Sequence, residues 1–311
     1  MKILLNLLLK INLDKRPPKS AQNISGFTMI ELLVGTIIAV LLITPLLGFV
    51  VDILNTDVKE TAKTNTEQEL QAAVDYIEQD LSQAIYIYDQ AGIDLIEDQL
   101  PYNGDDTRTP KLVFWKRERV ENSVPVVGCT PLTDEERCWD DAYVMSLVAY
   151  YLMEDQQNAW CQPSGANCPG RIGRFTIRDE VKKFDGTWVC DGTPSPCTTE
   201  QQSQFAKSEG FNNFDPDDLT AWERDGDYDA NNTPEVLVNY IDEFQLQSVT
   251  ANNEDETDTS PSTTSNNLAT ITIKGNALRR LEKDANCGTD PSPFCPTATL
   301  QVRGGSKYGS D

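Results

Sequence analysis

The sequence predicts an α+β protein in which one long N-terminal helix packs on an antiparallel β-sheet that carries disulfide-closed loops. Three observations support this fold class. An apolar run occupies residues 27–51, and an apolar stripe with helical spacing follows at 70–88. The remaining chain alternates segments rich in β-branched and aromatic residues with segments rich in glycine, proline, asparagine and aspartate.

The apolar run predicts a transmembrane helix. Between Phe27 and Val51 the only charged residue is Glu31. A helix of that length rises about 38 Å, which exceeds the hydrocarbon core of about 30 Å. The 26 residues before the run carry five basic side chains and one acidic one. Because basic flanks stay in the cytoplasm, we expect a single-pass protein with residues 27–54 in a membrane and the rest exported.

The helix is expected to continue beyond the membrane over residues 55–88. Residues 55–69 are polar and rich in threonine, so we expect them to be exposed. Apolar residues then recur at steps of three and four, which predicts one face that docks against a sheet. The stripe consists of Leu70, Ala73, Val74, Ile77, Leu81, Ala84, Ile85 and Tyr88. We predict that the helix ends near Tyr88, because Gly92 lies just beyond.

Residues 89–311 are predicted to form an exported, β-rich globular domain. Segment 251–267 is of low complexity and predicts a mobile loop. The candidate strands share β-branched and aromatic residues. They are residues 111–117, 143–153, 173–178, 236–247, 269–274 and 298–303.

The eight cysteines all lie after the apolar run, which is typical of an oxidised, exported domain. A zinc site is the alternative, but no spacing is CxxC and the chain has no histidine. Eight cysteines allow 105 connectivities, so sequence-local pairing is a hypothesis. The local pairs are Cys129–Cys138, Cys161–Cys168, Cys190–Cys197 and Cys287–Cys295.

Composition excludes several functions. The net charge of −23 argues against a nucleic-acid partner, which requires a basic surface. The absence of histidine excludes histidine-based catalytic triads and histidine metal sites. No GxSxG, P-loop or GxGxxG motif is present, so we expect no enzyme. Paired carboxylates can hydrolyse glycosides, which leaves a membrane-tethered glycosidase as an alternative.

Calcium is the only candidate cofactor. Segment 225–231 alternates carboxylates with other residues, as the start of a calcium loop does. The EF-hand pattern then fails, because Ala230 stands where glycine is needed and Val236 where the bidentate glutamate would stand. A solvated acidic turn is the alternative interpretation. The candidate ligands are Asp225, Asp227, Asp229 and Asn231.

The five tryptophans have two interpretations. Exposed indole rings could stack on sugars, whereas buried rings would belong to the core or cover it beside the cysteines. We favour the second interpretation. The residues are Trp115, Trp139, Trp160, Trp188 and Trp222.

Residues 26–33, GFTMIELL, resemble the class III signal of type IV pilins and type II secretion pseudopilins. The resemblance implies that the prepilin peptidase removes leader 1–26 by cleavage after Gly26. It also implies N-methylation of Phe27 and a role for Glu31 in filament assembly. A carboxylate buried among packed helices needs a cation, which the α-amino group of a neighbouring copy could supply.

Other segments are similar to narrower groups of this family. Residues 67–87 resemble the segment after the stalk in minor pilins of the PilW and GspJ kind. Residues 44–49, 77–89 and 112–118 look most like the cyanobacterial hormogonium polysaccharide secretion pseudopilins, the HpsC-like group. That resemblance implies a part in exopolysaccharide secretion and gliding motility.

The family resemblance also implies partners and a location. The partners would be other pilins through the N-terminal helix, the prepilin peptidase, the inner-membrane assembly platform and, as a further candidate, polysaccharide. The C-terminal domain would lie in the periplasm or on a cell-surface filament. The alternative from another class is a membrane-anchored surface domain that binds polysaccharide or calcium.

Overall fold

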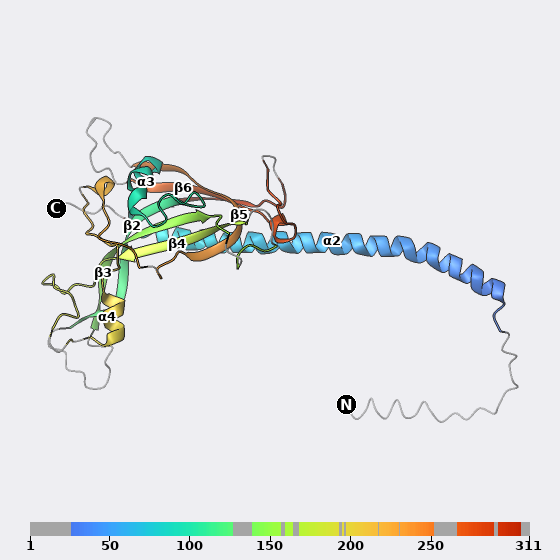
Figure 1. Ribbon diagram of the computed structural model, residues 1–311, viewed down its shortest axis with the longest axis horizontal. Coiled ribbons are helices and arrows are strands. Elements are labelled where there is room, and N and C mark those ends of the chain that lie inside the picture. Colours follow the sequence, from blue (N-terminus) through green and yellow to red (C-terminus); the bar gives the residue numbers. More distant parts are fainter. Residues whose placement is uncertain are drawn as a thin grey trace, which may run out of the picture. The chain divides into compact units, whose positions relative to one another are not determined.

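The computed structural model describes residues 26–126, 139–156, 159–163, 168–192, 195, 197–216, 218–229, 231–251, 266–288 and 292–305. The chain divides into two compact units, with the boundary between Asn55 and Thr56. One helix, α2 (Met29–Leu81), runs through this boundary. Figure 1 shows α2 and the strands in sequence colours.

The described part of the first unit is the N-terminal portion of α2 with the three residues before it. Every side chain from Gly26 to Leu54 is exposed. Within the part of the chain that the structure describes, α2 is the one helix long and apolar enough to cross a membrane. A helix is therefore present over the predicted segment 27–54, but it begins at Met29 and not at Phe27; its composition suits a single-pass anchor.

The second unit is built on one antiparallel sheet of seven strands, in which each strand pairs with the next along the chain. All six predicted strands are present with longer bounds, and one further strand precedes them. The strands are β1 (Ala84–Ile87), β2 (Arg108–Pro125), β3 (Trp139–Met153), β4 (Gly170–Arg178), β5 (Glu235–Ala251), β6 (Asn266–Gly275) and β7 (Thr297–Arg303).

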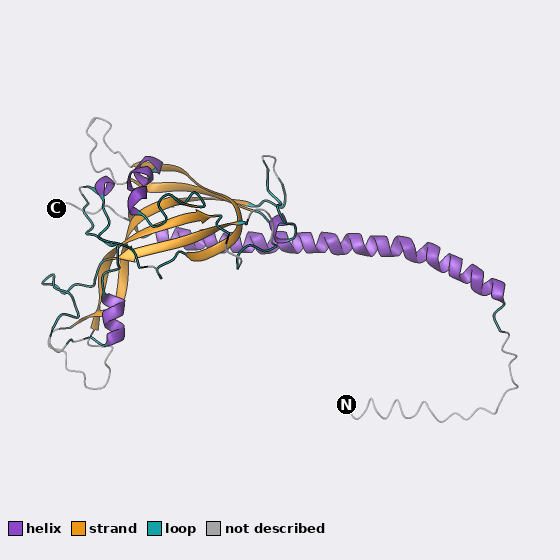
Figure 2. Ribbon diagram, viewed as in Figure 1, coloured by secondary structure: helices purple, strands orange, loops and turns teal. Residues whose placement is uncertain are grey.

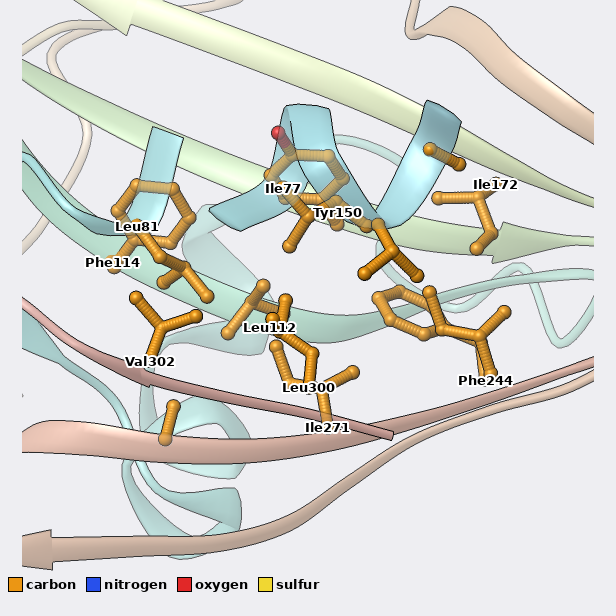
Figure 3. Packing of buried hydrophobic residues seen from close by; sticks show 14 of the residues in the cluster. Ile77, Leu81, Leu112, Phe114, Tyr150, Ile172, Phe244, Ile271, Leu300 and Val302 are labelled. Carbon is orange, nitrogen blue, oxygen red and sulfur yellow. The ribbon is translucent and has the colours of Figure 1, made fainter. Parts of the chain in front are cut away.

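The C-terminal part of α2 packs on one face of this sheet. Figure 3 shows Ile77 and Leu81 of α2 among Leu112, Phe114 and Tyr150 of β2 and β3. The same cluster includes residues from β1 and from β4 to β7, so all seven strands contribute to it. The apolar stripe that begins at Leu70 therefore docks against the sheet, as the sequence predicts.

The sheet curls so that its ends approach each other. Gly304, just after β7, lies against the start of β1, where a Cβ on this glycine would be 2.6 Å from the carbonyl oxygen of Ala84. Only a residue without a side chain fits at this approach. The curl lets the first and last strands share one core around α2.

The opposite face of the sheet is covered by short elements. These are α3 (Gln90–Ile96), η1 (Glu97–Gln99) and η3 (Leu219–Ala221), with the loop that follows Phe205. Their core centres on Trp115 of β2, whose ring meets Phe211, Phe214 and Trp222 edge-on. The helical turn η4 (Leu278–Arg280) follows β6 and lies apart from this core.

A third, smaller core lies where β2 and β3 extend beyond their other partners. The strands stay paired to Pro125 and Trp139, whereas β1 reaches only Lys116 and β4 only Ser146. Helix α4 (Thr199–Phe205) and the segment before it cover one face of this projection (Figure 2). We call the projection and the described residues of 179–205 the hairpin lobe.

The predicted end of the helix at Tyr88 is wrong. Helix α2 ends at Leu81, and residues 84–87 form β1 on the edge of β2. The apolar spacing continues past the helix because Ala84 and Ile87 of β1 enter the same core as Leu81. Gly92 lies inside α3, whose N-cap Asp89 accepts a hydrogen bond from the Gly92 N–H at 2.8 Å.

Candidate functional site

The segment that carries the resemblance begins as exposed, non-helical chain. Gly26, Phe27 and Thr28 precede the helix, and Phe27 is 81% exposed. Thr28 starts α2: its Oγ1 accepts a hydrogen bond from the Glu31 N–H at 3.3 Å, and its carbonyl accepts one from Leu32 at 3.2 Å. The Gly26–Phe27 peptide bond therefore lies in exposed chain outside the helix.

Glu31 lies in the first turn of α2, where the positive end of the helix dipole favours a carboxylate. Its side chain is exposed, and the residues around it are apolar. From Met29 to Val51 it is the only charged side chain. A helix packed against this surface would bury one carboxylate, which is tolerated only with a cationic partner.

The two threonines on the apolar surface of α2 between Met29 and Leu54 have their hydroxyls satisfied within the helix. Thr36 donates to the Leu33 carbonyl and Thr44 to the Val40 carbonyl, each at 2.8 Å. Pro45 removes one backbone donor inside the helix. A long apolar surface of this kind is suited to lipid or to other apolar helices.

A buried ionic cluster fixes the other end of α2 to the sheet. Asp80 is 5% exposed and accepts hydrogen bonds from Lys116 Nζ at 2.7 Å, Tyr150 Oη at 2.8 Å and Arg174 Nε at 2.8 Å. Burial raises the pKa of Asp80, but the hydrogen bonds and charges of Arg174 and Lys116 lower it more. The net pKa lies below its ordinary value, so Asp80 stays ionised at neutral pH.

A clasp holds α2 where it leaves the sheet. Arg280, in η4, donates from Nε to Thr66 Oγ1 at 2.8 Å and pairs with the Glu69 carboxylate. Its guanidinium lies 4.3 Å from the centre of the Tyr240 ring of β5. Thr66 is buried and also bonds the Ala62 carbonyl. The clasp and the Asp80 cluster therefore fix α2 at two points along the second unit.

Among the residues that the structure describes, three disulfides close short loops of the second unit. They are Cys161–Cys168, Cys190–Cys197 and Cys287–Cys295, with Cα atoms 4.7, 5.2 and 5.9 Å apart. Three of the four predicted local pairs are thus present. The fourth, Cys129–Cys138, lies outside the described residues.

Two of the predicted calcium ligands, Asp225 and Asp229, have partners within the protein. Asp225 pairs with Lys207 Nζ at 2.9 Å, and Asp229 Oδ1 accepts hydrogen bonds from the backbone and side chain of Asn231. Across the described residues no group of three or more Asp, Glu, Cys or His side chains is placed to hold a metal ion. Calcium binding at Asp225, Asp227, Asp229 and Asn231 stays a prediction.

The tryptophans belong mainly to the cores. Trp115 and Trp222 are buried together, and Trp139 and Trp188 pack against the core of the hairpin lobe. Trp160 adjoins Cys161 and is the most exposed of the five. Their positions support the interpretation as core and covering residues.

Sequence reasoning missed the Asp80 cluster. Asp80 is a charged residue beside the apolar stripe of α2, three residues after Ile77. Lys116 is a charged residue directly after the apolar residues 112–115 of β2. These two charged residues were the available signal. The pairing itself depends on the strand register, which brings Arg174 beside Tyr150.

Comparison of the chain with known protein families, with curated proteins and with solved structures finds no match. The fold and the site define the class of molecule. The described part of the chain has one exposed apolar helix suited to a membrane, joined to an antiparallel, disulfide-bonded β-domain.

Proposed function

We propose that this chain is a minor pilin or pseudopilin, a subunit of a type IV pilus-like or type II secretion-like filament. The observation that carries the proposal is the sequence Gly26-Phe27-Thr28-Met29-Ile30-Glu31 at the start of a long apolar helix. The Gly26–Phe27 bond is exposed, and Glu31 is the only charge on the following apolar surface up to Val51.

In this proposal the prepilin peptidase cleaves after Gly26 and Phe27 becomes the methylated N-terminus. The apolar surface of α2 holds the subunit in the inner membrane and then packs against the helices of other pilins. The β-domain lies in the periplasm or on a surface filament, where its disulfides are stable. It acts as a structural subunit without catalysis.

The proposal for the secreted material rests on the resemblance of three short segments. Residues 44–49, 77–89 and 112–118 resemble the hormogonium polysaccharide secretion pseudopilins. Residues 77–89 and 112–118 include Asp80 and Lys116, which join α2 to the sheet. We infer that the filament supports exopolysaccharide secretion and gliding motility.

The proposal is tested by the intact mass and N-terminal sequence of the protein recovered from membranes. We expect a chain that begins at N-methylated Phe27. A chain that retains residues 1–26 would exclude assembly as a pilin and leave a membrane-anchored surface domain that binds polysaccharide or calcium.

Two variants separate processing from assembly. Replacing Gly26 by Ala is expected to leave the leader attached, because the resemblance places the cleavage there. Glu31→Ala is expected to be cleaved normally but to be lost from sheared filaments, since it removes the carboxylate without touching the cleavage bond. Asp52→Ala, on the same helix, is the matched control. Unchanged recovery of Glu31→Ala in the filament fraction would contradict an assembly role.

A further inference from the structure

The hairpin lobe presents one aromatic side chain entirely to solvent. Phe184 is 102% exposed, compared with 66% for Leu95 on α3. A phenylalanine side chain buries roughly 150–250 Å² when it is enclosed. Aromatic side chains, phenylalanine among them, are enriched in the buried cores of protein–protein interfaces relative to the rest of the protein surface.

The backbone that carries Phe184 is held in one conformation. Lys183 N–H donates to the Thr187 carbonyl at 2.8 Å, and Gly186 N–H donates to the Lys183 carbonyl at 2.9 Å. Asp185 Oδ1 accepts from the backbone and hydroxyl of Thr187 at 3.0 and 2.6 Å. Gly186 has φ +80°, a conformation that glycine adopts without strain.

The base of this turn is anchored in the core of the hairpin lobe. Val181 and Val189 are buried on either side of the turn, and Val189 N–H donates to the Val181 carbonyl at 2.9 Å. Cys190, the next residue, forms the disulfide with Cys197. A residue held in its bound conformation loses little entropy on binding, so the rigid turn favours association.

The polar groups around Phe184 argue against sugar and lipid as ligands. Lys182 pairs with Asp179 at 2.9 Å, and Lys183 Nζ donates to the Asp191 carbonyl at 3.1 Å. With Asp185 bonded to Thr187, these side chains are engaged with the protein and not with an outside hydroxyl. The segment 179–192 contains four carboxylates and two lysines, which disfavours an anionic membrane surface.

A second copy of the chain is also disfavoured. Without the leader the net charge falls from −23 to −27, because the leader carries five basic and one acidic side chain. Two such copies repel each other. The negative segment 179–192 instead complements a partner whose surface is positive.

We propose that Phe184 is the anchor of a protein–protein contact, inserted into an apolar pocket with a basic rim on a different protein. The identification of this partner as another subunit of the same filament rests on the proposed function. The apolar pocket and its basic rim do not depend on the proposed function.

The test places the photo-crosslinking residue p-benzoyl-phenylalanine at position 184 of the full-length chain in the cells that produce it. The same residue at Leu95 is the matched control, because Leu95 is also exposed and lies on a different element. We expect an ultraviolet-dependent product with one other protein at position 184 and not at 95. A product with lipid, polysaccharide or a second copy, or no product, would overturn the proposal.

The second arm measures how much of the crosslinked protein copurifies with Phe184→Ala, Phe184→Trp and Leu95→Ala chains. Removing the ring is expected to reduce recovery at least about tenfold, the change expected for exposing a buried phenylalanine. Phe184→Trp and Leu95→Ala are expected to retain it. Equal recovery with Phe184→Ala would overturn the proposal even if position 184 crosslinks.

Two measurements keep the two proposals separate. The Cys190–Cys197 disulfide, checked by mass after alkylation, reports that the hairpin lobe of each variant is folded. The intact mass reports cleavage at Gly26. An uncleaved chain that still crosslinks through position 184 would contradict the proposal of a filament subunit and support the Phe184 contact. A cleaved chain without a crosslink would support the filament subunit and contradict the Phe184 contact.

Discussion

Asp80 is the buried acceptor that joins α2 to two cationic side chains of the sheet. Lys116 and Arg174 reach it from β2 and β4, and Tyr150 completes the cluster from β3. Replacing one member of a buried ion pair leaves its partners without compensation, which costs about 3–5 kcal/mol. This single residue therefore determines how firmly the helix is held.

We predict that Asp80→Asn lowers the free energy of unfolding by about 3–5 kcal/mol, because the two cations remain buried without a negative partner. Urea denaturation followed by tryptophan fluorescence measures this change. Asp75→Asn, on the exposed side of the same helix, is the control and should change stability by less than about 0.5 kcal/mol. Equal effects of the two substitutions would contradict a special role for Asp80.

The lowered pKa of Asp80 predicts how the stability of the domain changes at acid pH. Burial raises its pKa, the pairing with Arg174 and Lys116 lowers it more, and the result lies below the ordinary value of 3.8. A depressed pKa contributes stability that is present above the unfolded value and lost as the pH falls through the folded one. We therefore expect the stability difference between wild type and Asp80→Asn to be constant from pH 7 to about 5 and to shrink below about pH 4. A difference that stays unchanged down to pH 2 would show that it does not arise from the charge of Asp80.

At the level of elements, closure of the curled sheet depends on one of two adjacent glycines, which differ in their surroundings. A Cβ on Gly304 would lie 2.6 Å from the Ala84 carbonyl oxygen, whereas a Cβ on Gly305 would meet its nearest atom at 3.4 Å. The neighbour of Gly304 is backbone, so it cannot move aside without shifting β1. Gly304 therefore sets the distance between the two ends of the sheet.

We predict that Gly304→Ala destabilises the domain by roughly 1–3 kcal/mol, the usual cost of forcing an extra group into a packed site. Gly305→Ala should be nearly neutral, and it controls for the general effect of removing a glycine. Thermal unfolding of both variants gives the comparison, and hydrogen exchange should show faster exchange in β1 and β7 of Gly304→Ala alone. Equal melting temperatures would mean that the sheet ends do not depend on this contact.

The elements also show how far sequence reasoning reaches. Segments rich in β-branched and aromatic residues predicted six strands, and the helical stripe predicted the docking face of α2, because both signals are local in the sequence. The end of α2 was misplaced because Ala84 and Ile87 enter the same core from a strand as Leu81 does from the helix. Periodicity indicates which residues are buried. At a junction between a helix and a strand it does not show which of the two elements contains them.

The residues of the candidate site also fall into those that the sequence predicted and those that it did not. The Gly26–Phe27 segment and Glu31 are contiguous in sequence, so they were found there, as were the three local disulfides. The clasp of Arg280 on Thr66 joins residues more than 200 positions apart, and the Asp80 cluster joins four elements. Such contacts are fixed by strand order and register, which a single sequence without an alignment does not reveal.

On the scale of the whole molecule, the apolar surface and the folded core belong to different parts of the chain. All residues of the three described cores follow Thr56, as do the three described disulfides. The continuous exposed apolar surface lies between Met29 and Leu54. The part of α2 that the sheet needs therefore begins after the part that suits a membrane.

We predict that a fragment beginning at Thr56 is soluble and forms all three described disulfides, with a melting temperature close to that of the full chain in detergent, because it retains every described core residue. A fragment beginning at Ser82 should fail to fold, since it lacks Leu70, Ala73, Val74, Ile77 and Leu81, which fill the centre of the curled sheet. Removing these side chains forfeits roughly 1.5–3 kcal/mol of burial for each of the larger ones and leaves the sheet face that they cover exposed, a loss that matches or exceeds the net stability of a typical domain. Circular dichroism and thiol titration of the two fragments make the comparison; a folded Ser82 fragment would show that the sheet closes without the helix.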